Sequence, residues 1–221
     1  TRAMTVAKRY RYLWKPLAFI AALTPALLML AGGFGIAGRR LGTDPVEDLL
    51  LTCGKTALNL LCLTLAVTPV ARSAHQPQLL RLRRMLGLFA FFYVLLHFAV
   101  YLVLDRGLDV AMIVKDITKR PYITIGFVAL VLLIPLAATS TQRMMRRLGR
   151  RWQTLHRLIY PISILAAWHF YWQVKRDVTE PLIYAAIIAT LLGWRVWHRQ
   201  RRKPPAPVTS TYGSATAPER T

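Results

Sequence analysis

Residues 155–170 read LHRLIYPISILAAWHF, an apolar run with a histidine near each end, His156 and His169. A second apolar run, residues 86–104, carries His97, so three of the five histidines lie in hydrophobic segments. An imidazole buried in lipid is costly unless it has a partner. We therefore predict a buried partner for these histidines, and the partner we expect is the iron of a haem held within a helical bundle.

The rest of the chain shows the same block pattern. Its 221 residues are 55% hydrophobic, and the apolar ones gather in runs of about 20, the length that spans ~30 Å of hydrocarbon. A soluble domain would instead scatter them with a period of about two or 3.6 residues. The predicted fold class is an all-α integral membrane protein with six transmembrane helices, at about residues 15–37, 49–71, 86–104, 121–139, 154–173 and 181–197.

The charges predict the orientation of these spans. The formal net charge is +21, and the basic residues concentrate at the N-terminus, in every second connection, and after the last span. The other connections hold most of the acidic residues: Asp44, Glu47, Asp48, Asp105, Asp109, Asp116, Asp177 and Glu180. The positive-inside rule then places both termini in the cytoplasm. Since the basic charge follows alternate connections, we expect contact with membrane lipid and no nucleic-acid partner.

We divide the chain into a basic cytoplasmic arm (1–14), a six-helix domain (15–200) and a disordered cytoplasmic tail (201–221). The first apolar run is longer than the about 7–15 residues of a signal-peptide core, so we expect an uncleaved span.

Cys53 and Cys62 would lie ~13 Å apart along one helix, which is too far for a disulfide. The chain has no Gly-rich dinucleotide loop and no space for a soluble NAD or flavin domain.

Depth along the helices decides which histidines can meet. Blocks three and five both run outward from the cytoplasm, and at about 1.5 Å per residue His97 lies ~21 Å beyond Arg83 and His169 ~25 Å beyond Trp152. Tyrosines four positions before and after His97 would, taken alone, favour an aromatic packing face with one hydrogen-bonded histidine. The histidines of block five reverse that preference, and His97 and His169 are predicted to clamp one haem iron. Bis-imidazole ligation suits electron transfer better than oxygen binding.

A second site is expected near the inner face. His156 lies only ~6 Å beyond Trp152, at about 1.5 Å per residue, and has no evident histidine partner. Arginines gather at this depth, and an arginine fork binds propionate or phosphate bidentately. Candidate residues for a second haem, FMN or quinone are therefore His156, Arg83, Arg84, Arg150, Arg151 and Arg157. For the basic run 143–151 itself, anionic lipid head groups are the default interpretation.

The outer side offers charged loops but no substrate-binding domain. The outer connections, 38–48, 105–120 and 174–180, are short, and charged rims of this kind tune encounter rate more than affinity. We expect them to dock a partner protein through candidate contacts at Asp44, Glu47, Asp109, Asp116 and Asp177.

Lys55 lies inside block two and has two open interpretations. It either snorkels outward or pairs with an anionic group such as a haem propionate.

A set of short motifs resembles one family. The motifs are GTDPV (42–46), TPVAR (68–72), RRMLGL (83–88), KRPY (119–122), TST (139–141) and WQTLHRLIY (152–160). Together with His97 and the two histidines of block five, they resemble the ferric-reductase-like transmembrane domain. Within it they are most similar to the MsrQ (YedZ) family, over about residues 40–200.

The resemblance implies b-type haem, with FMN as a further cofactor, and electrons drawn from the quinone pool or a cytoplasmic flavin reductase. It also implies delivery to a periplasmic molybdopterin-dependent reductase that repairs methionine sulfoxide in proteins. Larger oxidase relatives carry a second histidine in the third span, where this chain has arginine. One haem is therefore expected, and a second is left open.

Two other function classes stay open from the residues alone. One is a self-contained ferric or oxygen reductase, which would need a flavin domain or a separate reductase. The other is a transporter whose buried histidines relay protons. The preferred interpretation is an electron-transfer subunit that is not a catalyst alone, and a haem absorption spectrum would discriminate between these classes.

Overall fold

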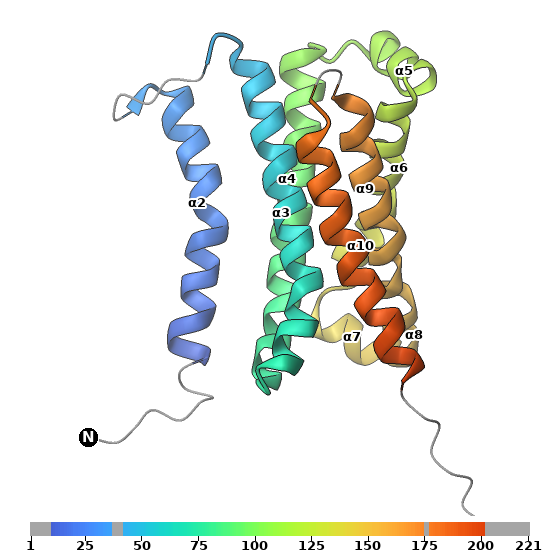
Figure 1. Cartoon of the computed structure of the whole chain (residues 1–221). Helices are drawn as coiled ribbons and strands as arrows, with labels where there is room; N and C mark the ends of the chain where they lie inside the picture. Colours follow the sequence, from blue (N-terminus) through green and yellow to red (C-terminus); the bar gives the residue numbers. More distant parts are fainter. Residues whose placement is uncertain (1–9, 37–41, 175–176, 202–221) are drawn as a thin grey trace, which may run out of the picture.

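The computed structural model describes residues 10–36, 42–174 and 177–201, and helices dominate that part of the chain (Figure 1). The element order is η1 (Tyr10–Trp14), α2 (Lys15–Gly33), α3 (Pro45–Ser73), η3 (Pro77–Arg81), α4 (Leu82–Val100), η4 (Tyr101–Asp105), α5 (Val110–Lys119), α6 (Pro121–Ala138), α7 (Gln142–Leu148), α8 (Arg150–Leu155), η5 (His156–Leu158), α9 (Ile159–Gln173) and α10 (Thr179–Gln200). The predicted all-α class is confirmed. Residues 1–9 of the predicted arm and 202–221 of the predicted tail lie outside the described residues.

The helix starts follow local sequence signals. The Asp44 carboxylate accepts hydrogen bonds from the backbone N–H of Val46 and of Glu47, both at 3.1 Å, and Pro45 opens α3. The Asp109 carboxylate caps α5 in the same way, at 3.0 Å from the Met112 nitrogen. An acceptor side chain before the first turn and a proline within it both favour helix initiation. These caps fix where the preceding loops end and the helices begin.

Four helical segments of the described chain are long and apolar enough to cross a membrane: Tyr12–Gly33, Pro45–Ser73, Pro77–Asp105 and Pro121–Ala138. They match the first four predicted spans. The fifth predicted span is covered by α9, with 15 residues, and by the short helical turns of α8 and η5 before it. The sixth is α10, whose 22 residues include Glu180 in the first turn and basic residues in the last. Six spans therefore remain a prediction, while a multi-pass membrane protein is supported.

The long helices stand side by side, and α5 lies across one end of the bundle (Figure 1). Packing is most extensive between α3 and α4, followed by α6 with α9 and α10 with α9. We call the end that carries α5 the α5 end, and the opposite end, where the described chain begins and finishes, the terminal end. The helices that carry His97 and His169, α4 and α9, both run from the terminal end towards the α5 end (Figure 1).

Two apolar cores hold the bundle together. The larger one joins α3, α6, α9 and α10 around Leu65 and Ile162, and the smaller one joins α2, α3 and α4. In the smaller core, the fully buried Tyr93 donates its hydroxyl to the Ala22 carbonyl at 2.8 Å and accepts from the Ala26 nitrogen at 2.9 Å. Tyr93 therefore fastens α2 to α4, which is a packing role.

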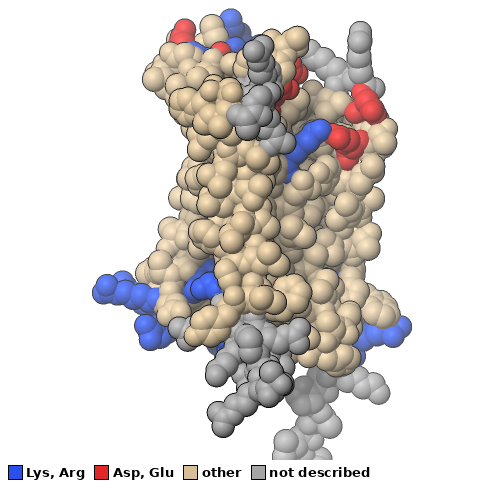
Figure 2. All heavy atoms as spheres, turned by 90° about the vertical axis from the view of Figure 1, so that its left-hand side faces the viewer, with Lys and Arg blue, Asp and Glu red and all other residues tan. Residues whose placement is uncertain are grey.

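Negative charge is unevenly distributed between the two ends. On the face shown in Figure 2, Asp and Glu appear at one end only, while Lys and Arg appear at both ends. The described acidic residues lie at the start of α3, around α5 and at the start of α10, all at the α5 end.

Cys53 and Cys62 are both buried and free, which confirms that they form no disulfide with each other.

Candidate functional site

His97 of α4 and His169 of α9 face each other near the α5 end. Their ring centres are 6.2 Å apart and their ring planes are inclined by 84°. The matched depth predicted for these two residues is confirmed by this geometry. Since they come from different helices, their separation is set by α3 and α6, which pack against both α4 and α9.

Each imidazole is oriented by a backbone carbonyl. Nδ1 of His97 lies 2.9 Å from the carbonyl oxygen of Leu50 on α3, and Nδ1 of His169 lies 2.7 Å from that of Tyr122 on α6. A carbonyl can only accept, so Nδ1 carries the proton in both rings. Nε2 of each neutral ring therefore keeps its lone pair, which is the form that ligates a metal.

A glycine makes room for each ring. Gly54 follows Leu50 by four residues and Gly126 follows Tyr122 by four, so both lie one helical turn beyond the accepting carbonyl. A Cβ at Gly54 would lie 3.4 Å from Nδ1 of His97, whereas one at Gly126 would lie 2.8 Å from Nδ1 of His169. The second distance is shorter than van der Waals contact allows. Each histidine thus has the same surroundings, a carbonyl partner and a glycine one turn later, and the glycine lies closer to the ring at His169.

The histidine pair lines a mostly apolar cavity of about 270 Å³ between α3, α4, α6 and α9. Its walls include Leu58, Val94, Leu130 and Ile162, and its mouth near the α5 end is polar. Ligand sites in proteins are typically apolar clefts with a few convergent polar groups. The cavity therefore has the character of a binding site for a mostly apolar ligand.

The donor set fits the iron of a haem. Two imidazoles on one metal need ring centres about 6 Å apart, because metal–nitrogen bonds are about 2 Å long, and the observed separation is 6.2 Å. Within the described residues, no group of three or more His, Cys, Asp or Glu side chains could hold a metal ion. Two histidines alone suffice when a macrocycle supplies the remaining ligands.

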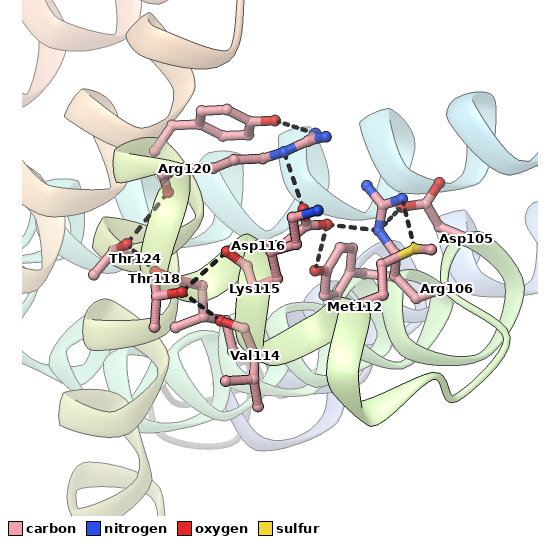
Figure 3. A network of polar contacts seen from close by, with 12 residues as sticks. Asp105, Arg106, Met112, Val114, Lys115, Asp116, Thr118, Arg120 and Thr124 are labelled. Carbon is pink, nitrogen blue, oxygen red and sulfur yellow. Dashed lines mark hydrogen bonds and ion pairs between the residues drawn. The ribbon is translucent and has the colours of Figure 1, made fainter.

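A buried carboxylate ties the mouth of the cavity together (Figure 3). The Asp116 side chain is only 7% exposed and forms ion pairs with Nε of Arg106 at 2.8 Å and Nε of Arg120 at 3.0 Å. It also accepts the Tyr101 hydroxyl at 3.2 Å. Tyr101 follows His97 by one turn, and Arg120 precedes Tyr122, whose carbonyl holds His169, by two residues. Asp116 therefore joins the segments that support the two histidines.

Lys55 also lines the cavity at this mouth, and its Nζ pairs with Glu180 of α10 at 2.5 Å. The side chains are 38% and 56% exposed, so the pair is accessible to water. The Lys55 ammonium therefore has a protein carboxylate as its partner, and both interpretations of Lys55 stay open.

The structure divides the residues predicted for the inner site. His156 stacks on Trp152 with ring centres 3.9 Å apart, and its Nδ1 lies 3.1 Å from the Trp152 carbonyl. Its Nε2 is buried and has no hydrogen-bond partner. Arg84 contacts Met145 of α7 at 3.5 Å, while Arg150 and Arg151 are exposed at the start of α8. These residues do not share one cavity with His156.

Arg83, whose charge acts on His156, and Arg157, the next residue in the chain, line a cavity of about 550 Å³ at the terminal end. We call it the basic cavity, and its arginine and histidine residues are Arg72, Arg83, Arg157, Arg195, His198 and Arg199. Four of these six were not among the predicted site residues. In the structure, the arginines that share a cavity therefore come from α3, α4, η5 and α10, and none comes from the run 143–151.

One candidate docking contact is wrong. Asp116 was predicted on the outer surface, but it is buried and paired with two arginines, because α5 folds over the end of the bundle. Asp44 and Asp109 cap helices yet remain exposed, as does Glu47. Hydrogen bonds from the side chain and backbone of Thr179 hold the pKa of the exposed Asp177 below its ordinary value. That carboxylate is therefore charged at neutral pH and available to a partner.

Sequence reasoning missed the two glycines and the two carbonyls that orient the histidines. A signal for the glycines exists, because each lies within an apolar run where glycine lowers helix stability and needs a packing reason. The accepting carbonyls of Leu50 and Tyr122 carry no sequence signal, since every residue has one.

Comparison with known proteins agrees with this geometry. Residues 53–167 match the family described as "Ferric reductase like transmembrane component". A relative from Bordetella pertussis, "Protein-methionine-sulfoxide reductase heme-binding subunit MsrQ", is 50% identical over 191 residues, 85% of this chain and 91% of the relative. Relatives with the same name from Ralstonia nicotianae and Xanthomonas axonopodis pv. citri are 53% and 52% identical, covering 81% and 76% of this chain and 82% and 81% of their own lengths. No solved structure matches the chain significantly.

Proposed function

Because the chain belongs to the MsrQ family of haem-binding subunits of protein-methionine-sulfoxide reductase, we propose that it passes electrons outward across the bacterial inner membrane through a b-type haem. Residues 15–200 form the membrane domain, with six spans and both termini in the cytoplasm. The terminal end of the bundle is then cytoplasmic and the α5 end periplasmic, in line with the positive-inside rule.

The observation that carries the proposal is the His97–His169 pair. Two imidazoles with protonated Nδ1 atoms line the same apolar cavity, at a ring separation of 6.2 Å. Haem ligated by two histidines supplies one-electron transfer and leaves no open position for oxygen. Leu50 and Tyr122 fix the tautomers, Gly54 and Gly126 make room for the rings, and the apolar wall excludes water from the site.

The position of the pair supports an outward exit for the electron. The α5 end carries short loops and exposed carboxylates, and the described loops there are too small to form a substrate-binding domain. We assign the exposed Asp44, Glu47, Asp109 and Asp177 to docking of a periplasmic, molybdopterin-dependent reductase. That partner would reduce methionine sulfoxide in periplasmic proteins.

Electrons enter at the terminal end, from the quinone pool or from a cytoplasmic flavin reductase. His156 is the candidate residue there, because its buried Nε2 has no hydrogen-bond partner. We assign to it a role in binding a second haem, FMN or quinone, with the nearby arginines on α4 and α8 as charge partners. The ring stacked on His156 is that of Trp152, so a second haem would need a ligand other than a facing histidine.

A reoxidation experiment tests the relay. Membranes containing the full chain are reduced, and the haem absorbance is followed with and without the periplasmic reductase and its sulfoxide substrate. We expect slow reoxidation alone and fast reoxidation when both are present, with the reductase lacking substrate as the control. If the partner and substrate gave no acceleration, the stand-alone ferric or oxygen reductase would become the better interpretation.

A further inference from the structure

The basic cavity at the terminal end is a cluster of cations without counter-charges. In the described part of the chain, no ion pair includes any of its arginines, and the acidic residues lie at the opposite end of the bundle. Like charges held together at short range repel each other, more strongly where water is partly excluded. The cavity is therefore electrostatically incomplete, and an anion would complete it.

The floor of the cavity is built from half-buried side chains. Arg195 of α10 donates from Nη2 to the Leu65 carbonyl at 2.6 Å and lies 5.4 Å from the centre of the Tyr160 ring. These two contacts hold the guanidinium in place. Its other terminal nitrogen, Nη1, is buried without a hydrogen-bond partner. This nitrogen of the guanidinium is therefore available to donate a hydrogen bond to a ligand.

Two further polar atoms in the cavity lack partners. His198 stacks on Trp194 with ring centres 4.5 Å apart, and its Nδ1 is buried and unpaired. The hydroxyl of Thr68 is also buried and unpaired. Buried polar atoms in folded proteins are nearly always hydrogen-bonded, so these three atoms around one basic cavity are available to a polar ligand.

Arginines at the rim would hold the same ligand from outside. Arg72 lies 5.6 Å above the Trp194 ring, and Arg83 enters from α4. Arg157 and Arg199 are exposed at the edge. A phosphate matches this set because it offers oxygens on several sides and binds arginine forks bidentately.

The surroundings of the cavity favour a lipid as the source of that phosphate. Leu192 and Val196 line one wall, and Val196 and Trp197 are 57% and 47% exposed beside it. Tryptophans at the end of a membrane helix typically lie at the head-group level. A phosphate in the cavity would thus continue into apolar surface on α10, where acyl chains can lie.

We propose that the basic cavity binds the phosphate head group of an anionic phospholipid such as phosphatidylglycerol. Basic pockets between membrane helices on the cytoplasmic side are a known setting for such head groups. A soluble phosphate compound shares the recognition chemistry but would leave the apolar wall uncovered. The lipid site does not depend on haem binding, so it can fail while the electron relay stands.

The test measures lipid binding to the full chain by native mass spectrometry in a neutral detergent. The probes are phosphatidylglycerol, phosphatidylcholine, FMN and inorganic phosphate. The cavity variant is Arg72→Gln/Arg83→Gln, and the matched control is Arg146→Gln/Arg147→Gln, which removes two exposed charges from α7 at the same end. A further variant, Arg195→Lys, keeps the charge but loses the fork, and thermal melting followed by circular dichroism reports whether each variant is folded.

We expect wild type and the control to retain one phosphatidylglycerol in preference to phosphatidylcholine. The cavity variant should bind it more weakly by about tenfold or more, because hydrogen bonds to charged groups are the stronger class. If the cavity variant does not fold, a weakened affinity of Arg195→Lys decides in favour of the site.

Equal binding by wild type, cavity variants and control would overturn the proposal and indicate general attraction to a basic face. Displacement of the lipid by FMN or phosphate at comparable concentration would also overturn it and assign the cavity to a soluble phosphate ligand.

Discussion

The histidine pair and the basic cavity lie in the same helical bundle, yet their polar groups are satisfied in different ways. Around His97 and His169, each ring has a carbonyl partner, and Lys55, Arg106 and Arg120 at the mouth are all paired with carboxylates. In the basic cavity, the arginines have no carboxylate within the described ranges, and three buried polar atoms are unpaired.

This difference indicates which kind of ligand each site lacks. A charge-balanced cavity with two neutral imidazoles calls for a metal in an apolar macrocycle. A cavity with excess positive charge calls for an anion. The same bundle can hold both because the cations at the α5 end, Lys55, Arg106 and Arg120, are paired with carboxylates, whereas the arginines of the basic cavity lie at the end without described acidic residues.

The largest expected effect comes from removing either histidine of the pair. His97→Ala or His169→Ala should abolish the low-spin haem absorbance, because one axial ligand is lost in each variant. His156→Ala should keep that absorbance and lower only the content of flavin or of a second haem. Absorption spectra and extracted cofactor content of the three purified variants check this. Full retention of low-spin haem in both pair variants would contradict the assignment of the pair.

The next effect separates the two glycines. In Gly126→Ala the new Cβ would lie 2.8 Å from Nδ1 of His169, so the ring must move and most of the haem should be lost. Gly54→Ala brings a Cβ to 3.4 Å from His97 and should retain most of it. Overpacking of this kind costs about 1–3 kcal/mol of stability. Haem content relative to protein is the measurement, and equal content in the two variants would show that ring orientation is not set by these contacts.

Asp116→Asn should have a smaller effect on haem content but a clear effect on stability. The change removes the charge that pairs with Arg106 and Arg120 while keeping the shape of the side chain. Breaking a buried ion pair on one side typically costs about 3–5 kcal/mol, and the half-exposed Arg120 should place the loss towards the low end. Thermal unfolding measures the loss. Exposed Asp109→Asn is a comparison at the same end, expected to cost about 1 kcal/mol through the lost helix cap.

If Asp116 positions the histidines, the midpoint potential of the haem and its low-spin spectrum should shift in Asp116→Asn but not in Asp109→Asn. A loss of stability with an unchanged potential and spectrum would assign Asp116 to fastening α5 alone.

The sequence was sufficient for the helical class, the first four spans and the meeting of His97 with His169, because hydrophobic run length and depth along a helix are one-dimensional quantities. It was insufficient for Asp116, since only the fold of α5 over the bundle decides whether that carboxylate is buried. It was also insufficient for the basic cavity, where Arg72 and Arg195 come from helices far apart in the chain. Their proximity depends on how α3 packs against α10, which periodicity does not encode.

The smallest effect concerns Lys55 and Glu180, and it decides between the two interpretations of Lys55. An ion pair with side chains 38% and 56% exposed is worth no more than about 1 kcal/mol. If Lys55 only pairs with Glu180, then Lys55→Met and Glu180→Gln should lower stability by the same small amount and leave haem retention unchanged. If Lys55 also holds a haem propionate, Lys55→Met should release haem faster, whereas Glu180→Gln should slow the release by freeing the ammonium. Haem transfer rates to an apoprotein acceptor, measured for both variants and the double variant, separate these cases. Equal rates in all three would show that Lys55 pairs with Glu180 only. The positive charge of Lys55 at the mouth of the cavity would then be neutralised by Glu180 and not by a haem propionate.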